Sequence, residues 1–227
     1  MFRPEEYVDL ARTAHRELFE EVEFVWDALK KVGAYLQVHL EPANRGRVMG
    51  HAFVGERVYI GDGTVVEPGA VIKGPAWIGR NCQVRAGAYI RENVILGDWV
   101  VAGNSCEFKN AVVFDGCEVP HFNYVGDSIL GHKAHLGAGV ILGNVKLDRS
   151  EIVVEVDGRK FPTGLRKFGA IVGDRTEIGC NSVINPGSVL GRDSILYPLS
   201  QWRGVLPEKS VVKTRQEQQV VKRRATA

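Results

Sequence analysis

From Val48 to Phe108, an apolar residue returns at every sixth position of this chain without a break. The eleven positions are Val48, Val54, Ile60, Val66, Ile72, Ile78, Val84, Ile90, Leu96, Ala102 and Phe108. The residue four places after each of them is small or β-branched. A long aliphatic side chain at this period must point into a prism, and the small residue must lie beside a corner, where space is tight. The spacing therefore predicts a parallel β-helix of hexapeptide repeats.

The repeat continues beyond Phe108 after two backward shifts of one residue each. Its later members are Val113, Val119, Val125, Leu130, Leu136, Leu142, Val172, Ile178, Ile184, Leu190 and Leu196. The twenty-two hexads predict roughly seven triangular coils, whose strands pair about 4.8 Å apart and bury one another's faces. The 26 glycines exceed the roughly 7% of average proteins and fit the many tight turns that such an all-β fold needs.

The first 44 residues follow a different period and are predicted to form a short helical hairpin. Apolar residues line one helical face from Tyr7 to Leu18 and a second face from Val22 to Leu36. We expect this cap to pack against the first coil and to shield its open edge.

The rest of the chain is expected to consist of one long repeat array and a tail. The β-helix is expected over residues 45–205, with an excursion at 144–170 that contains a β-hairpin turning at Asp157-Gly158. A hairpin that projects from a coil is a suitable place for a substrate lid or a subunit contact. Residues 206–227 are expected to form an extended or helical C-terminal tail.

The charge balance argues against nucleic-acid and membrane surfaces. The chain has 29 basic and 27 acidic residues, and its only basic run, Lys222 to Arg224, lies in the tail. Its charged start is unlike a signal peptide, and no window reaches the ~18 apolar residues of a membrane span. Four cysteines without a CxxC pair favour a reducing, cytoplasmic location and predict no zinc site.

The hexad rule fails at one place, over Pro120-His121-Phe122-Asn123-Tyr124. Bulky and polar residues replace the glycine and the small residue that the repeat requires there. Violations of an otherwise strict pattern are expected at functional sites. This segment is therefore the first candidate for the chemistry of the protein.

The residues around this break carry a resemblance to a known family. The run from Val119 to Asp127, followed by Leu136-Gly137-Ala138-Gly139 and Asn144, resembles the acetyltransferase domain of bifunctional glucosamine-1-phosphate acetyltransferase/UDP-N-acetylglucosamine pyrophosphorylases. Archaeal-type members are the most similar, because they also have an excursion ending like Thr163 to Ile171. The likeness covers roughly residues 58–215 and implies a left-handed β-helix, a homotrimer, and an acetyltransferase half that stands alone.

The resemblance also implies roles for individual residues. The histidine matching His121 removes a proton from the amino group that attacks acetyl-CoA, and its ordinary pKa of about 6.5 suits a general base. The other matched positions are Tyr124 and Asn144 for the sugar, Arg85 and Lys109 for its phosphate, and Ala138 and Cys180 for acetyl-CoA. The implied reaction is acetylation of an amino-sugar phosphate such as glucosamine-1-phosphate, with no metal.

The repeat itself offers a second candidate for the phosphate site. Lys73, Arg91 and Lys109 are eighteen residues apart and should stack on consecutive coils. Like charges about 5 Å apart repel each other, and a bound anion would relieve the repulsion. Spacing therefore favours Arg91, whereas the family motif favours Arg85, and three long side chains splaying into solvent would need no ligand at all.

Two departures from the family pattern bear on the identity of the sugar. Ser150 and Val153 stand where archaeal relatives have lysines, although Lys146 and Arg149 lie close by. The coil with Leu142-Gly143 also lacks the usual threonine and cysteine before the asparagine. The sequence therefore leaves open both which sugar phosphate is the substrate and whether the domain has kept its activity.

Two other functions compete with this interpretation. γ-Class carbonic anhydrases share the fold and bind zinc through three histidines, and this chain has His121, His132 and His135. However, His132 and His135 are three residues apart and would face opposite sides of a strand. The second alternative is a non-catalytic protein that binds a nucleotide sugar or assembles with a separate sugar-1-phosphate nucleotidyltransferase.

Overall fold

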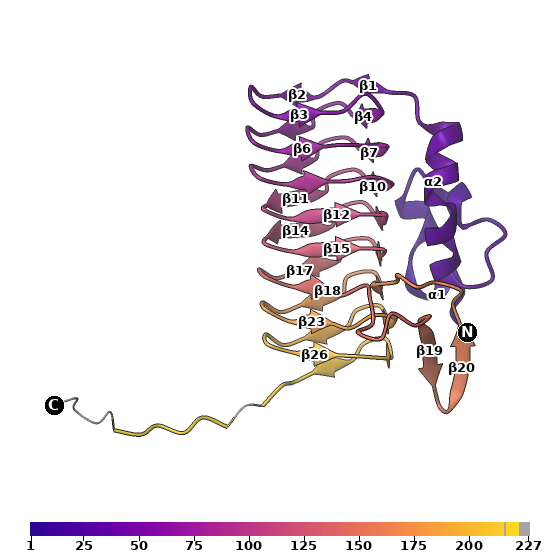
Figure 1. Ribbon diagram of the computed structural model, residues 1–227, viewed down its shortest axis with the longest axis vertical. Helices are drawn as coiled ribbons and strands as arrows, with labels where there is room; N and C mark the ends of the chain where they lie inside the picture. The colour runs from indigo at the N-terminus through magenta and orange to yellow at the C-terminus, as the bar shows by residue number, and fades with distance from the viewer. Residues whose placement is uncertain (216, 223–227) are drawn as a thin grey trace.

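The computed structural model describes residues 1–215 and 217–222 and shows three parallel sheets wound into a prism (Figure 1). Sheet A contains, in order, β1 (Ala43–Asn44), β4 (Val58–Ile60), β7 (Ala76–Ile78), β10 (Val94–Leu96), β13 (Ala111–Val113), β16 (Ile129–Leu130), β21 (Ala170–Val172), β24 (Ser188–Leu190) and β27 (Val205–Leu206). Sheet B contains β2 (Arg47–Val48), β5 (Val65–Val66), β8 (Gln83–Val84), β11 (Val101–Asn104), β14 (Glu118–His121), β17 (His135–Leu136), β22 (Glu177–Ile178), β25 (Ile195–Leu196) and β28 (Val211–Val212). Sheet C contains β3 (Phe53–Val54), β6 (Val71–Ile72), β9 (Tyr89–Ile90), β12 (Glu107–Lys109), β15 (Tyr124–Gly126), β18 (Ile141–Leu142), β23 (Val183–Ile184) and β26 (Gln201–Trp202). The predicted all-β parallel β-helix is confirmed.

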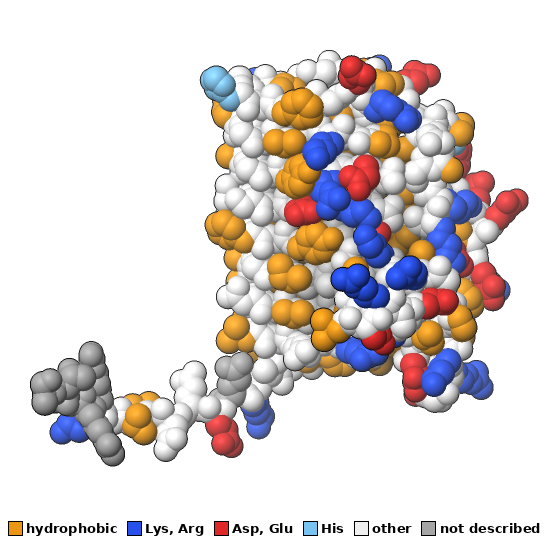
Figure 2. Space-filling view, viewed as in Figure 1, with side chains coloured by type: hydrophobic (Ala, Val, Ile, Leu, Met, Phe, Trp, Pro, Cys, Tyr) orange, Lys and Arg blue, Asp and Glu red, His pale blue; other side chains and the backbone are white. Residues whose placement is uncertain are grey.

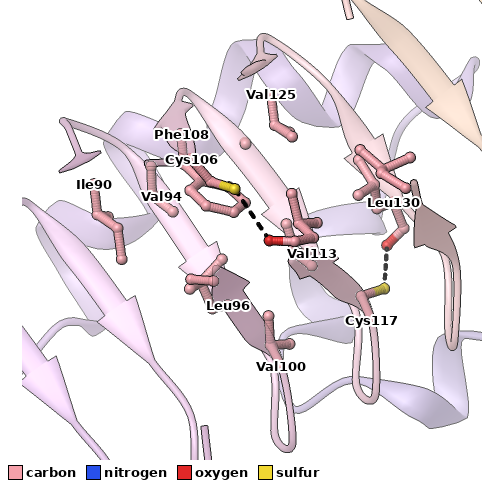
Figure 3. Packing of buried hydrophobic residues seen from close by; sticks show 14 of the residues in the cluster. Ile90, Val94, Leu96, Val100, Cys106, Phe108, Val113, Cys117, Val125 and Leu130 are labelled. Carbon is pink, nitrogen blue, oxygen red and sulfur yellow. Dashed lines mark hydrogen bonds between the residues drawn. The ribbon is translucent and has the colours of Figure 1, made fainter. Parts of the chain in front are cut away.

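The interior of the prism follows directly from the six-residue period. In sheet C, Phe108 pairs with Ile90 on one side and with Val125 on the other, and all three side chains are fully buried. Figure 3 shows these residues pointing into the same core as Leu96, Val100 and Leu130. Because each coil places an aliphatic side chain above the next one, every coil buries the apolar surface of its neighbours.

The turns at the corners explain which residues interrupt the strands. At the corner between sheets C and A, called the C–A corner, Asn93, Asn110 and Asp127 have positive φ angles of 60°, 46° and 47°. At the corner between sheets B and C, the B–C corner, Ser105 and Phe122 both have a φ of 54°. Asparagine and aspartate tolerate this left-handed conformation better than other non-glycine residues, whereas a bulky residue such as phenylalanine does not.

The number of coils is larger than predicted. The structure contains eight complete coils and two strands of a ninth, instead of roughly seven. The hexad pattern misses β1 at the start and β26 to β28 at the end. In the last coil the inward-facing Trp202 and Leu206 are only four residues apart, because the chain turns tightly at Gly204 with a φ of 100°. Consequently β27 and β28 reach into the segment that was assigned to the tail.

The N-terminal segment differs from the predicted hairpin in both form and position. Its only long helix within the described residues is α2 (Ala28–His39), preceded by the short α1 (Pro4–Tyr7) and 3-10 turns at residues 10–12, 16–19 and 25–27. Figure 1 shows this segment beside the prism along sheet A, rather than over the first coil. No helix in the described part of the chain is long and apolar enough to cross a membrane.

The composition of sheet A explains this position. Several of its strands are apolar on both faces, as continuous apolar runs such as Val94–Leu96 and Ala111–Val113 require. Outward-facing Ile95, Val112 and Phe114 are fully buried against the N-terminal segment. Covering this face removes its outward apolar side chains from water, which stabilises the segment along the flank.

The excursion forms the predicted hairpin. Strand β19 (Val153–Val156) pairs antiparallel with β20 (Arg159–Pro162), and Asp157 and Gly158 turn the chain with positive φ angles. The hairpin packs on the N-terminal segment, with the ring centroids of Phe161 and Phe2 5.0 Å apart. The excursion and the N-terminal segment therefore share one apolar cluster on the outside of the prism.

Candidate active site

The break in the repeat forms a fixed corner with two projecting side chains. Strand β14 runs up to His121, and Phe122 then turns the B–C corner with 61% of its surface exposed. The side chain of Asn123 is buried beneath them, accepting a hydrogen bond from the His121 N–H at 3.1 Å and donating one to the Gly137 carbonyl at 2.8 Å. This buried amide holds the corner in place, and the exposed His121 imidazole faces solvent.

His121, Ala138 and Cys180 occupy one column along the B–C corner. The Gly139 N–H donates to the His121 carbonyl at 2.9 Å, and the Asn181 N–H donates to the Ala138 carbonyl at 2.8 Å. The three residues thus lie on consecutive coils, about 4.8 Å from one coil to the next. The structure therefore brings the predicted base and both predicted acetyl-CoA contacts together.

A mostly apolar groove continues from Cys180 over the outer face of sheet B. Its lining residues are His135, Gly137, Glu177, Ile178, Gly179, Cys180, Ile195, Leu196, Tyr197 and Pro198. Cys180 is exposed on the middle of the three coils that line this groove, next to the backbone of Gly137. The groove offers an apolar ligand a surface that begins at His135 and Gly137, one coil from His121.

Tyr124 and Asn144 meet in a second cluster, across sheet C from the His121 column. The Asn144 Nδ2 atom donates to the Tyr124 hydroxyl at 3.1 Å and to Asp127 Oδ2. The ammonium of Lys109 lies 3.4 Å from Asp127 Oδ1. Three of the residues predicted to bind the sugar phosphate, Lys109, Tyr124 and Asn144, therefore belong to one hydrogen-bonded network.

The position of the Tyr124 ring depends on a glycine. A Cβ atom on Gly126 would lie 2.5 Å from the Tyr124 hydroxyl, so the ring lies over the backbone where a side chain would otherwise stand. Burial, followed by the charge of Asp127, raises the pKa of Tyr124. The hydroxyl therefore stays protonated at neutral pH and has a proton to donate to a ligand.

The cations that stack on sheet C at intervals of eighteen residues already have partners within the chain. The Arg91 guanidinium lies 2.9 Å from Glu107 and 3.4 Å from Glu92, and the Lys73 ammonium lies 5.2 Å from the centre of the Tyr89 ring. The expected repulsion along the ladder is thus relieved within the chain.

Arg85 lies apart from the Tyr124 cluster, at the end of β8 on sheet B. Its guanidinium donates to the Gln83 side chain at 2.9 and 3.2 Å. It lies two coils above Pro120, since the Arg85 N–H bonds the carbonyl of Ala102 on the intervening coil. The structure does not bring Arg85 into contact with Lys109, Tyr124 or Asn144.

A basic hollow adjoins Asn144 and was not assigned from the sequence. It is lined by Val145, Arg149, Arg166 and Lys167, where the excursion leaves and re-enters the prism. The Phe168 N–H donates to the Asn144 carbonyl at 3.0 Å, which ties the two ends of the excursion together. Figure 2 shows Lys and Arg side chains gathered on this face of the molecule. None of the three basic residues pairs with a carboxylate within the described part of the chain.

The basic hollow and the role of Asp127 both had signals in the sequence. Arg166 and Lys167 lie inside the segment that resembles archaeal relatives, and Arg149 was noted as a substitute for the missing lysines. Asp127 had no assigned role, but it is the acidic member of a corner column in which the two preceding coils have Asn93 and Asn110.

The three histidines considered for zinc do not converge. The Nδ1 atoms of His132 and His135 are engaged at 2.7 Å by the Asp115 carbonyl and by Glu177, respectively. Within residues 1–215 and 217–222, no group of three or more His, Cys, Asp or Glu side chains is arranged to hold a metal ion.

Comparisons with known proteins agree with the family inferred from the motif. The GMPPB C-terminal domain family matches residues 72–157. The bifunctional sugar-1-phosphate nucleotidylyltransferase/acetyltransferase of Sulfurisphaera tokodaii is 30% identical over 155 residues, covering 68% of this chain and 39% of that protein. The bifunctional protein GlmU of Methanococcus maripaludis is 33% identical over 137 residues, covering 60% and 33%. The chain resembles the C-terminal part of these bifunctional proteins.

The match spans only about a third to two fifths of the length of these relatives. Among solved structures, PerB from Caulobacter crescentus in complex with CoA and GDP-perosamine matches with a TM-score of 0.35 and 18% identity, covering 73% of this chain and 52% of that chain. A TM-score this low supports no inference about the present chain.

Proposed function

We propose that this protein transfers the acetyl group of acetyl-CoA to the amine of an amino-sugar phosphate, with glucosamine-1-phosphate as the first candidate acceptor. The observation that carries the proposal is the position of His121. Its exposed imidazole shares a column with Ala138 and Cys180 and lies three residues before Tyr124, so it stands between the two proposed ligand sites.

In the proposed reaction, the sugar amine attacks the thioester carbonyl while the His121 imidazole removes its proton. A C–N bond forms, the C–S bond breaks, and the departing CoA thiolate takes up the proton. An imidazole suits this step because its unprotonated ring nitrogen can accept a proton from the amine and pass it on.

For acetyl-CoA, we propose that its pantetheine arm follows the column of Ala138 and Cys180 along the B–C corner. The groove on sheet B supports this, because it includes Cys180 and offers mostly apolar surface. Acetyl-CoA bound in this way would place its thioester on the coil of His121. No metal ion takes part in the proposed step.

For the acceptor, we propose that Tyr124 and Asn144 contact the sugar hydroxyls and that Lys109 and the basic hollow bind the phosphate. The hollow is favoured over Arg85 and Arg91 because those two side chains are engaged by Gln83 and Glu107.

Removing two charges of the hollow tests this assignment. The double substitution Arg166→Gln/Lys167→Gln is expected to raise the KM of the sugar phosphate about tenfold and to leave the KM of acetyl-CoA unchanged, since hydrogen bonds to charged groups are the stronger ones. Steady-state kinetics with each substrate varied in turn measures both constants. The matched control is Arg85→Gln, for which a change below twofold is expected. A larger effect of Arg85→Gln than of the double variant would contradict the assignment.

We further propose that the protein is a homotrimer. Phe122 and Leu199 expose 61% and 52% of their surfaces along the B–C corner, and a subunit contact there would remove both side chains from water. Light scattering is expected to give three times the 25.0 kDa chain mass. Phe122→Asn, which suits the positive φ at this position, is expected to shift the mass toward the monomer. A monomeric wild-type protein would contradict the proposal.

The proposed function is tested by thiol release from acetyl-CoA with a panel of hexosamine 1- and 6-phosphates. Release with at least one acceptor supports the proposal. Absence of release with every acceptor, together with no thermal shift on addition of CoA, would refute it. A thermal shift with a nucleotide sugar alone would instead favour the non-catalytic alternative.

Two further parts of the proposal concern the surroundings of the protein. A separate sugar-1-phosphate nucleotidyltransferase is proposed to act on the acetylated product. A cytoplasmic location is proposed as well. It is supported by four free cysteines, three of which are buried in the prism, because free thiols persist in reducing compartments.

A further inference from the structure

Asp127 occupies a corner position that does not require an acid. It continues the column of Asn93 and Asn110 at the C–A corner, and all three have the same left-handed backbone conformation. Asparagine satisfies this turn on two consecutive coils. The turn alone therefore does not explain why the third coil carries a carboxylate.

The carboxylate of Asp127 is almost completely buried and fully engaged. Its residue is 3% exposed. One oxygen accepts a hydrogen bond from Asn110 Nδ2 at 2.9 Å and lies 3.4 Å from the Lys109 ammonium, while the other accepts a bond from Asn144 Nδ2. Burying a charge is costly unless it is paired and hydrogen-bonded, so these partners are held firmly in place.

The contacts of Asp127 determine how its neighbours face a ligand. Because the carboxylate only accepts hydrogen bonds, it orients the Asn144 amide with the nitrogen inward, toward Asp127 and the Tyr124 hydroxyl. The Asn144 oxygen is thereby left to accept from a ligand. The same carboxylate holds the Lys109 ammonium 3.4 Å from its other oxygen, with 18% of the Lys109 side chain exposed.

We infer that Asp127 is a positioning residue for the acceptor sugar phosphate, acting through Asn144 and Lys109 rather than by touching the substrate. This inference rests on the proposed function, because it assigns the acceptor side of that site. The inference predicts that the charge of Asp127 affects the binding of the acceptor and not the binding of acetyl-CoA.

The test is Asp127→Asn, which keeps the side-chain shape and suits the left-handed backbone. Its amide presents one NH2 group to side chains that are themselves donors, so Asn144 or Lys109 must turn away. We expect the kcat/KM for the acceptor to fall about 10- to 100-fold, mainly through KM, with the KM of acetyl-CoA unchanged.

A double-mutant cycle separates positioning from general stability. If Asp127 acts through Asn144, the combination of Asp127→Asn with Asn144→Ala is expected to lower kcat/KM no further than the larger single effect. The matched control is Asp174→Asn. Asp174 is also buried, accepts backbone hydrogen bonds from Asp9 and His132, and lies near Arg192, but it faces the N-terminal segment. The Asp174→Asn substitution is expected to lower the melting temperature of the protein without changing the KM of the acceptor.

Three kinetic outcomes would overturn the inference: an unchanged acceptor KM in Asp127→Asn, multiplicative effects in the cycle, or an equal rise of the acceptor KM in Asp174→Asn. A crystal structure of Asp127→Asn provides a readout that needs no activity. Movement of the Asn144 amide or of the Lys109 ammonium away from residue 127 supports the inference, and a structure in which neither side chain has moved overturns it. If the wild-type protein acetylates no sugar phosphate, the proposed function fails, while the crystal structure still tests the positioning role.

Discussion

Replacing His121 with alanine is expected to lower the rate of thiol release from acetyl-CoA by about 10²- to 10⁴-fold, the usual contribution of a general base. The alanine variant should retain the fold, because the His121 side chain is exposed and the corner beneath it is held by Asn123. The effect should therefore appear in kcat, with the KM of both substrates changed little. Steady-state kinetics with the acceptor found in the panel measures this.

The matched control for His121 is His51→Asn. His51 is also an exposed histidine at the B–C corner, with a φ of 66°, but it belongs to the first coil. The His51→Asn substitution is expected to leave kcat unchanged. A His121→Ala variant with kcat within threefold of the wild type would rule out general-base catalysis by this residue.

Trp26→Ala is expected to lower the free energy of unfolding by about 3–5 kcal/mol, as for other fully buried tryptophans. Trp26 is 0% exposed, and its ring centroid lies 5.0 Å from that of Phe2, 4.9 Å from Phe24 and 6.0 Å from Phe168. It therefore joins the N-terminal segment to the excursion. Urea unfolding at a fixed protein concentration measures the loss.

The Trp26→Ala substitution should also weaken acceptor binding, because Phe168 follows Lys167 and its N–H donates to the carbonyl of Asn144. We expect its acceptor KM to rise while the KM of acetyl-CoA stays the same. Trp99→Ala is the control, since Trp99 is 64% exposed and should cost no more than about 0.5 kcal/mol. Equal destabilisation by the two alanine substitutions would contradict the packing role of Trp26.

The parts of the fold that repeat strictly were predictable from the sequence, and the irregular parts were not. Sheets B and C follow from one inward residue in each hexad, such as Phe108 or Leu136. The path of the N-terminal segment could not be predicted from the helical period of Tyr7 to Leu18, because it depends on the apolar outer face of sheet A. The signal was present in runs such as Val94–Leu96, which are apolar on both faces.

The site divides in the same way. His121, Ala138 and Cys180 were assigned from the family resemblance, and the strand register of the structure places them in one column. The roles of Arg85 and Arg91 depend on where flexible side chains find partners, and neither period nor motif contains that information. Asp127 was missed because its partners, Lys109 and Asn144, come from the coils on either side, seventeen or eighteen residues away.

The N-terminal segment along sheet A also limits how copies of this protein can associate. With one of three sides covered, only sheets B and C remain open to another prism, and they meet at a single corner. Contacts between unlike faces form a closed ring when the rotation between copies completes a circle, and an endless filament when it does not. A ring closed through the B–C corner would leave only the covered side of each copy facing outward. Raising the protein concentration would then increase the number of closed rings and not the number of copies in each ring.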